Sequence, residues 1–206
     1  MAVALARPCR ARGSLTQKLV METAIALFTE RGYDRTSMND IAAALGITKP
    51  ALYYYFAGKE EIFVAAIVGA SARIDAALVE ASFDTKSAQD RISVFINCYS
   101  EALADPLFRG LALADERVLG ESAVEATRRG KRSSLKKLGS YLQDAGIPPS
   151  ESRSLALATF GALNWSAATF GERSGTELHD VTRMMIDLVS EKLKSVASHG
   201  LGRMEK

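Results

Sequence analysis

Apolar residues recur at helical spacing along most of the chain, and no stretch shows the strict alternation typical of a β-strand. The first such pattern runs from Thr16, a suitable helix cap, to about Arg31, and Gly32 ends it. Two shorter patterns follow within residues 36–59. The chain is therefore predicted to be all-α, and to begin with three helices close together.

The two short helices have the residues of a helix-turn-helix at their ends. Ser37 and Asp40 form a capping-box pattern at the start of the first helix. Gly46 supplies the left-handed conformation that a tight turn requires. Thr48 can cap the second helix, and Pro50 fits in its first turn because that amide has no intrahelical partner. This spacing predicts that the second helix enters the major groove of DNA.

The remaining chain predicts about six longer helices, which would form a larger second unit. Five of them are expected at 59–81, at 87–104, from 105 onward, at 122–145 and at 177–195. The sixth begins after a cap at Ser150 or Ser152 and ends at about 170. Residues 155–170 are apolar almost all round, which favours burial on both sides of that helix. Either a subunit interface or a monomer core that surrounds the helix would provide this burial.

Residues 1–14 contain three arginines and no periodic apolar pattern, so we interpret them as a flexible basic arm. Arg7, Arg10 and Arg12 could touch DNA phosphates or a minor groove. The alternatives are a disordered tail without a DNA contact, or a start codon assigned too far upstream.

Composition and charge favour a soluble DNA-binding protein of the cytoplasm. The chain has 206 residues, of which 48% are hydrophobic, and no apolar run approaches the roughly 20 residues of a membrane span. Its first arginines follow the short apolar start instead of preceding it, which makes a poor secretory signal. Residues 1–60 carry 8 Lys and Arg against 5 Asp and Glu, whereas residues 61–206 carry 18 against 19.

Candidate catalytic and metal-binding residues are sparse. Cys9 and Cys98 form neither a disulfide framework nor a metal-binding spacing. With His179 and His199 as its two histidines, the chain has little from which to build a His-based catalytic or zinc site. We therefore expect no metal, no cofactor and no enzymatic activity. An α-helical enzyme is kept as an alternative, for which residues 115–117 and Glu101 offer carboxylates.

The second helix of the motif is predicted from Thr48 to Phe56 and carries three consecutive tyrosines. The four-residue spacing of Leu52 and Phe56 predicts that both face inward. Tyr53 and Tyr54 would then face outward, where phenol hydroxyls can reach phosphates and bases. Tyr55 either touches a phosphate or closes the edge of the small domain. The alternative, a packing helix rich in tyrosine, would have to bury three adjacent aromatic rings, which a short helix cannot do.

Two lysines and an alanine supply the remaining candidate DNA contacts. Lys49 could donate hydrogen bonds to guanine O6 and N7, and Ala51 could touch a thymine methyl group. Lys59, at the start of the following helix, is expected to meet a phosphate.

Residues 16–63, including the run ALFTERGYDRTSMNDIAAALGITKPALYYYFAGKEEIF, resemble the DNA-binding region of the TetR family of transcriptional regulators. The resemblance implies a three-helix head (residues 15–60) and an all-α body (residues 61–206) for ligand binding and dimerisation. By position it implies DNA contacts from Met38, Asn39, Thr48, Lys49, Pro50, Ala51, Tyr53, Tyr54, Tyr55 and Lys59. Pro50 and Ala51 depart from the common family pattern, as does Gly58, which replaces a polar cap.

The resemblance also implies a homodimer formed by the last two helices, and a small ligand inside the body. Candidate interface residues are Ala158, Gly161, Ala162, Trp165, Ala168, Val181, Met184, Met185 and Leu188. Candidate pocket residues are Phe95, Tyr99, Leu103, Phe108, Leu111, Tyr141, Phe160, Asn164 and Trp165, each of which could instead belong to the plain core. Such an apolar chamber suits a lipophilic ligand.

The run from Gly161 to Trp165 is similar to regulators that bind acyl-CoA esters, so an acyl-CoA or a fatty acid is the expected ligand class. A cluster of cations could then meet the phosphates of CoA. A solvated helix face would explain the same cluster equally well. Its members are Arg128, Arg129, Lys131, Arg132, Lys136 and Lys137.

These patterns together favour a homodimeric repressor of a palindromic operator, released from DNA by a small lipophilic ligand. A DNA-binding regulator without a small-molecule ligand is the main alternative. Membrane partners are not expected.

Overall fold

The computed structural model describes residues 15–82, 87–170 and 175–201. Within those ranges the chain forms nine α-helices, one 3-10 helix and no strand, which confirms the all-α prediction. The elements are α1 (Gln17–Arg31), α2 (Met38–Leu45), α3 (Lys49–Tyr53), α4 (Lys59–Ser82), α5 (Ala88–Ala104), α6 (Pro106–Ala112), η1 (Glu116–Val118), α7 (Glu121–Asp144), α8 (Pro149–Phe170) and α9 (Gly175–Leu201). The expected basic arm, residues 1–14, lies outside the described residues.

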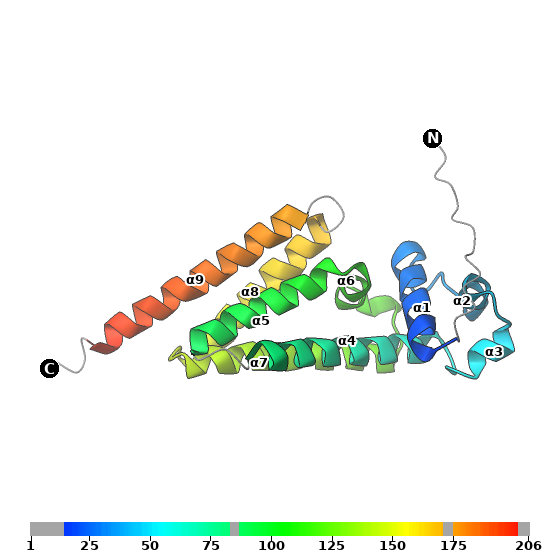
Figure 1. The fold of residues 1–206 in the computed structure, drawn as a ribbon, viewed down its shortest axis with the longest axis horizontal. Coiled ribbons are helices and arrows are strands. Elements are labelled where there is room, and N and C mark those ends of the chain that lie inside the picture. The colour runs from blue at the N-terminus through cyan, green and yellow to red at the C-terminus, as the bar shows by residue number, and fades with distance from the viewer. Residues whose placement is uncertain (1–14, 83–86, 171–174, 202–206) are drawn as a thin grey trace.

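Helices α1, α2 and α3 form the head at one end of the elongated molecule (Figure 1). As predicted, the Thr16 hydroxyl caps α1 by accepting a hydrogen bond from the backbone N–H of Leu19 at 3.2 Å. Gly32 ends the helix with a positive φ of 92°. The interior of the head is formed by apolar side chains from all three helices, among them Val20, Ile41 and Leu52, which are fully buried.

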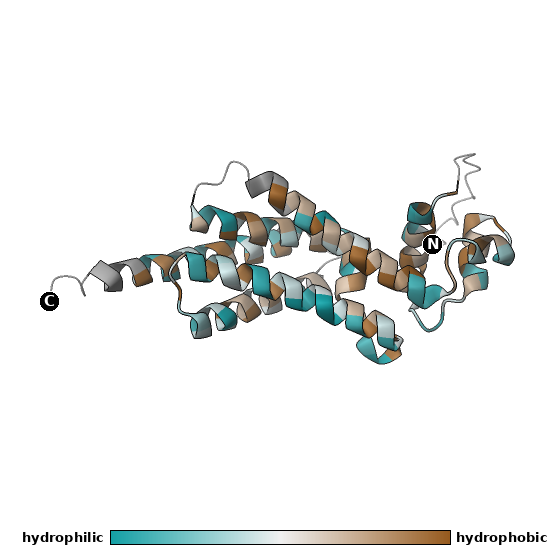
Figure 2. Ribbon diagram, turned by 90° about the horizontal axis from the view of Figure 1, so that it is seen from below, coloured by the Kyte–Doolittle hydropathy of each residue, from teal (hydrophilic) through white to brown (hydrophobic). Residues whose placement is uncertain are grey.

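Helix α4 leaves the head and runs along the whole body, where α7 lies beside it (Figure 1). Helices α8 and α9 pack against each other in antiparallel directions. Helix α5 packs against α4, α7 and α9, and α7 also packs directly against α8. Hydrophobic and hydrophilic residues alternate around these helices (Figure 2), as expected where one side of each helix packs on a core.

Helix α4 contributes to the head and to the body. Ile62 and Phe63 pack under the head, where the ring of Phe63 lies 5.6 Å from that of Tyr33 between centroids. Ile67 and Ile74, further along the same helix, are buried within the body. The buried residues of the two units therefore form one continuous core.

Three helices have ends that differ from the sequence-based prediction. Helix α3 stops at Tyr53, three residues before Phe56. Helix α8 begins at Pro149, so the prediction that Ser150 or Ser152 caps it is wrong. Proline is favoured in the first turn of a helix because its missing N–H is not needed there, and Ser152 instead donates its hydroxyl to the Pro149 carbonyl at 3.0 Å. Helix α9 is longer than expected at both ends.

Helix α8 is buried on one side only within a single chain. Ala156, Leu163 and Ala167 are almost completely buried, whereas Leu157 is 50% exposed and Trp165 is 65% exposed. Within the described residues the core of a single chain therefore does not surround α8, and the second side of this helix is exposed.

Gly110 in α6 lies where α6 crosses α1, and a side chain at this position would clash with the Thr29 hydroxyl. We expect Gly110→Ala to lower the free energy of unfolding by about 1–3 kcal/mol, because the two helices must move apart. Adding Thr29→Ala should recover most of this loss, since it removes the clashing oxygen. Urea denaturation of the two single variants and the double variant measures the coupling.

Gly69→Ala in α4 is the matched control, because a Cβ at position 69 meets no atom within 4 Å. That variant should be more stable than the parent by up to about 1 kcal/mol, through lower entropy of the unfolded chain. If Gly110→Ala behaved like Gly69→Ala, the close contact between α1 and α6 would be disproved.

Candidate DNA-binding surface

The turn between α2 and α3 has the geometry that the sequence predicts. The Ser37 hydroxyl accepts from the Asp40 backbone N–H at 3.3 Å, and the Asp40 carboxylate accepts from the Ser37 N–H at 2.8 Å, completing the capping box. A further hydrogen bond from the Ser37 hydroxyl lowers the pKa of Asp40. Gly46 has the left-handed φ of 68°, and the Thr48 hydroxyl accepts from the Ala51 N–H at 3.4 Å.

Helix α3 presents polar and aromatic side chains outward on this frame. Leu52 and Phe56 are buried, as predicted, whereas Tyr53 is 46% exposed and Tyr54 is 86% exposed. The Lys49 ammonium lies 5.9 Å from the centre of the Tyr53 ring, within the range of a cation–π contact. Helix α3 thus carries a cation and two phenol groups on its exposed side.

The other candidate DNA contacts of the motif fall into two groups. Asn39, Thr48 and Pro50 are exposed, and Ala51 is half-buried. Met38, by contrast, is only 8% exposed and belongs to the core of the head. Its side chain is therefore not displayed on the surface, although its position in the motif suggested a DNA contact.

Tyr55 closes the edge of the head. Its hydroxyl donates to the Leu15 carbonyl at 3.1 Å, and its ring makes an edge contact with that of Tyr54, with 5.4 Å between centroids. Of the two roles considered for Tyr55, this geometry favours packing, with the side chain fixing the chain that enters α1.

Lys59 points into the head. Its ammonium group donates to the carbonyl oxygens of Tyr33 at 2.7 Å, Thr36 at 3.2 Å and Asp34 at 3.3 Å. It also lies 4.4 Å from the centre of the Tyr33 ring. These contacts satisfy three backbone carbonyl groups of the connector between α1 and α2. They also use the three donors of the ammonium group, so Lys59 has little capacity left to bind a DNA phosphate.

Most of the candidate pocket residues form a packed aromatic cluster in the body. The rings of Tyr99 and Phe160 lie 4.5 Å apart between centroids, and Phe95 and Phe108 extend the cluster. The Tyr99 hydroxyl donates to the Asn164 side chain at 3.1 Å, and burial raises the pKa of Tyr99. Leu103 and Leu111 are buried and Tyr141 half-buried beside these rings, whereas Trp165 is exposed on the outer side of α8.

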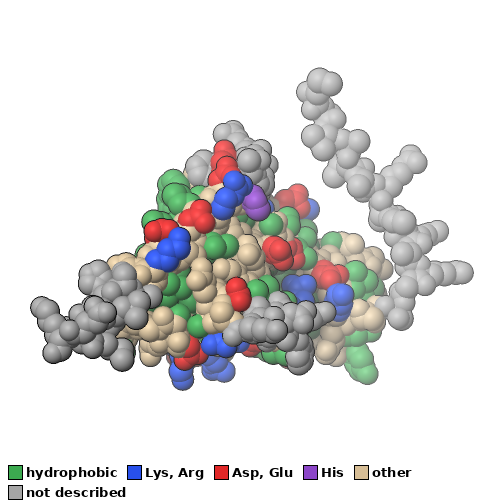
Figure 3. Space-filling model, turned by 60° about the vertical axis from the view of Figure 1, so that its left-hand side comes forward, with side chains coloured by type: hydrophobic (Ala, Val, Ile, Leu, Met, Phe, Trp, Pro, Cys, Tyr) green, Lys and Arg blue, Asp and Glu red, His purple; other side chains and the backbone are tan. Residues whose placement is uncertain are grey.

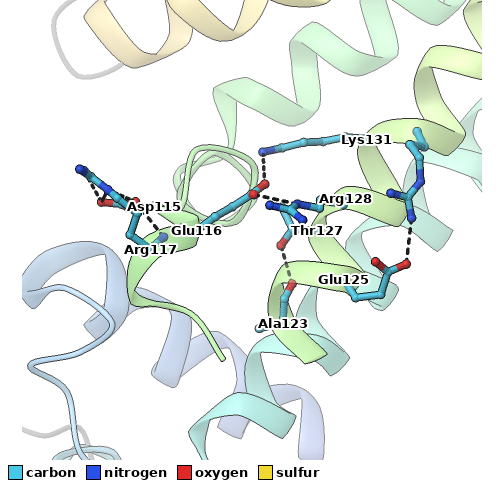
Figure 4. A network of polar contacts seen from close by, with 9 residues as sticks. Asp115, Glu116, Arg117, Ala123, Glu125, Thr127, Arg128 and Lys131 are labelled. Atoms are coloured by element: carbon cyan, nitrogen blue, oxygen red, sulfur yellow. Dashed lines mark hydrogen bonds and ion pairs between the residues drawn. The ribbon is translucent and has the colours of Figure 1, made fainter. Parts of the chain in front are cut away.

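Ion pairs with carboxylates account for most of the predicted cation cluster on α7 (Figure 4). Arg128 and Lys131 both reach Glu116, at 3.0 and 3.3 Å, and Arg132 reaches Glu125 at 2.8 Å. In the same way Arg129 pairs with Glu125, and Lys137 with Asp75. Lys136 is the one member for which the described residues provide no ion pair. Side chains of both signs also alternate on the face of the body shown in Figure 3.

Two of the carboxylates named for the enzymatic alternative, Asp115 and Glu116, are held in surface ion pairs. The Arg117 guanidinium lowers the pKa of Asp115 to about 2, and Arg128 lowers the pKa of Glu116. Neither group has the raised pKa of a general acid or base. Among the described residues no group of three His, Cys, Asp or Glu could hold a metal ion, and no helix is long and apolar enough to cross a membrane.

Sequence reasoning missed the role of Glu60, in the first turn of α4. Its carboxylate accepts from the backbone N–H groups of Ser122 and Ala123, at the N-terminus of α7. The only signal in the sequence was indirect: α7 begins after Gly120, which has no side chain with which to cap the helix.

The comparison with protein families agrees with this geometry. Residues 20–66 match the family model described as bacterial regulatory proteins, tetR family. Residues 20–66 are therefore a DNA-binding region of the TetR type. It is 46% identical over 44 residues to the biofilm operon icaADBC HTH-type negative transcriptional regulator IcaR from Staphylococcus epidermidis. That match covers 21% of this chain and 24% of IcaR, so the chain spans about a quarter of the length of the curated relatives it matches.

Solved structures of the family share the fold over nearly the whole chain. The regulator PfmR from Thermus thermophilus superposes with a TM-score of 0.71 at 24% identity, over 86% of this chain and 96% of PfmR. AibR, solved in complex with isovaleryl coenzyme A and operator DNA, superposes with a TM-score of 0.71 at 20% identity, over 84% of this chain and 96% of AibR. At these identities the superpositions establish the all-α TetR fold of both head and body.

The contacts of Lys59 predict a role in stability. We expect Lys59→Met to lower the free energy of unfolding by about 1.5–3 kcal/mol, because three carbonyl groups lose a charged donor. Lys49→Met, on the exposed side of α3, should leave stability within about 0.5 kcal/mol of the parent. Thermal and urea denaturation of both variants checks this. A stable Lys59→Met protein would mean that the connector does not depend on Lys59.

Proposed function

We propose that this protein is a homodimeric transcriptional repressor of the TetR family that binds a palindromic operator and is released from it by a small lipophilic ligand. The observation that carries the proposal is the exposed side of α3. Lys49, Tyr53 and Tyr54 project outward from a helix that is fixed at both ends by buried residues and caps. A helix held in this way can place its N-terminal residues on base edges, while phenol hydroxyls reach phosphates.

The base-reading capacity of α3 is narrow. Lys49 is its one basic side chain and can donate to guanine, whereas Pro50 and Ala51 offer apolar surface to a thymine methyl group. Asn39 on α2 is exposed and adds an amide that can contact phosphate or sugar. Thr48 contributes a hydroxyl beside them, and Tyr55 and Lys59 act from within the head.

Dimerisation is supported by an apolar surface on α8 and α9. Leu157 and Trp165 on α8 and Met184 and Leu188 on α9 are each at least half exposed. Every candidate interface residue is exposed or half-buried, namely Ala158, Gly161, Ala162, Trp165, Ala168, Val181, Met184, Met185 and Leu188. Exposed small residues allow close approach of a second helix pair. Two copies of this surface would complete a four-helix bundle about a twofold axis.

A lipophilic effector would enter between α4 and α7. An inner cavity of about 50 Å³ borders Tyr99, Phe108 and Leu111 of the aromatic cluster. A groove of about 770 Å³ lies outside it, and Ile67 and Gly130 line both spaces. Ligand sites commonly have volumes of about 300–1,000 Å³, so the inner cavity must expand to hold a ligand.

Such an expansion would move α4, and with it the head. AibR, which shares the fold, is solved with an acyl-CoA and operator DNA, and this supports an acyl-CoA or a fatty acid as the effector class. The alternative of a regulator without a ligand is favoured by one observation, the tight packing of Tyr99 against Phe160. Mass spectrometry of molecules that co-purify with the native protein distinguishes the two.

DNA binding is tested with two variants of α3 and the DNA upstream of the gene. We expect Lys49→Ala and Tyr53→Ala each to weaken binding by about 1–3 kcal/mol, because a base or phosphate contact is lost. For Lys49→Ala the slope of log K against log salt should also fall by about one charge. Fluorescence anisotropy over a salt series measures both quantities.

Lys194→Ala on α9, with a side chain that is 70% exposed, is the control for loss of one positive charge. It should bind DNA like the parent. Unchanged affinity of both α3 variants would remove the observation on which the proposed function rests.

The proposed dimer predicts that a charge in the α8–α9 surface separates the subunits. Leu188→Glu should shift the protein from dimer to monomer, because a carboxylate would be buried in an apolar contact. Sedimentation velocity measures the mass, and circular dichroism checks that the helices are retained. Val79→Glu, an equally exposed apolar position on α4, should leave the mass unchanged. A parent protein that is monomeric at micromolar concentration contradicts the proposal.

A further inference from the structure

We propose that Glu60 is a positioning residue that fixes the head at a defined angle to α7, and so determines which half-site spacing in an operator the dimer accepts. This inference rests on the proposed function, because it assigns a residue to the spacing of two heads on DNA. It follows from contacts at the joint between head and body that the sequence patterns did not indicate.

Glu60 caps a helix to which it does not belong. Its carboxylate accepts from the Ser122 N–H at 2.9 Å and from the Ala123 N–H at 3.4 Å. These amides are among the first of α7, which have no partner within the helix. A carboxylate at this position is also stabilised by the positive end of the helix dipole. One side chain of α4 thereby holds the start of a 24-residue helix of the body.

Gly120 makes room for this contact. It occupies the N-cap position of α7 and forms no side-chain cap of its own. A Cβ at position 120 would overlap the carboxyl group of Glu60. Any of the usual capping residues, Ser, Thr, Asp or Asn, would therefore displace Glu60. The α7 cap can come from position 120 itself or from α4, but not from both.

Neighbouring residues leave Glu60 available for this role. Glu61 binds the turn that leads into α4, because its carboxylate accepts from the Ala57 N–H at 2.5 Å. Lys59 points in another direction and binds the carbonyls of the connector between α1 and α2. Three consecutive charged residues thus bind three different parts of the molecule. Lys59 holds the head, Glu60 holds α7, and Glu61 holds the turn before α4.

The arrangement connects the groove between α4 and α7 to the head. Glu121 and Ser122, next to the Glu60 contact, line one end of that groove. If the helices separate at this end, the Glu60 hydrogen bonds must lengthen or the first turn of α4 must follow α7. Since Lys59 in the same turn is bound to the head, the head would follow as well. Head orientation, and with it the distance between the two α3 helices of a dimer, is then set by Glu60.

The test separates a positioning role from simple capping. Glu60→Ala removes both the cap of α7 and the connection, and should lower the melting temperature. Glu60→Ala combined with Gly120→Asp restores a cap from within α7 but leaves the connection broken. Glu61→Ala is the matched control, because it removes a neighbouring carboxylate of the same charge whose hydrogen bond goes to Ala57, in the turn before α4. All variants are made in the full-length chain.

Binding is measured on a series of DNA duplexes derived from a site selected in vitro with the parent protein. The series lengthens or shortens the spacer between half-sites by one or two base pairs. If the parent binds the duplex with its best spacer at least about tenfold more tightly than the next-best duplex, the preference of the Glu60→Ala, Gly120→Asp variant should be less than about threefold. Its melting temperature should match that of the parent, and Glu61→Ala should keep the parental preference.

A second readout does not depend on DNA. Spin labels are placed at Ala44→Cys in the head and Ser140→Cys in α7, in a Cys9→Ser, Cys98→Ser background diluted with unlabelled protein. The distance distribution should be narrow for the parent and for Glu61→Ala, and broad for the double variant. Parental spacer preference or a parental distance distribution in the double variant would overturn the inference, leaving Glu60 as a cap only. A parent protein that binds no DNA, with the expected broadening intact, would instead contradict the proposed function.

Discussion

The structure depends on the requirement that α4 bury apolar residues in two places at once. Its first turns carry Ile62 and Phe63, which close the base of the head, and its later turns carry Ile67 and Ile74, which lie in the body. A helix is stiff along its axis, so the two sets of residues cannot move independently. Any displacement of the body end of α4 must appear at the head, because the buried contacts at both ends resist being opened.

The joint between head and body is formed by α1, α4 and α6. Cavities of about 270 Å³ and about 390 Å³ border α1, α4 and α6, where close contact is made at Gly110 and Thr29. Directional contacts also hold the head: Lys59 binds the head side of this joint and Glu60 binds the body side.

The body combines a packed aromatic interior with an outer surface of paired charges. The sequence allowed either a phosphate-binding patch or a solvated helix face for the cluster on α7. In the structure, Glu116 and Glu125 each pair with two of its cations. These carboxylates come from η1 and from α7 itself. Opposite charges that meet in this way contribute little stability when exposed, but they keep the surface close to neutral. Direct attraction of DNA is therefore left to the head.

The sequence by itself determined the head almost completely. Ser37, Gly46 and Thr48 act through neighbours in the chain, and such local caps and turns depend on residue type and spacing alone. The same reasoning located most helix ends, whereas the predicted burial of both sides of α8 is not seen within one chain, where Leu157 and Trp165 are exposed. Contacts between residues far apart in sequence were not predictable, because they depend on how helices cross. Only the tertiary structure decided that Met38 is buried, that Lys59 binds backbone carbonyls, and that Glu60 caps α7 across 62 residues of sequence. Each of these depends on the angle between two helices, which no local pattern specifies.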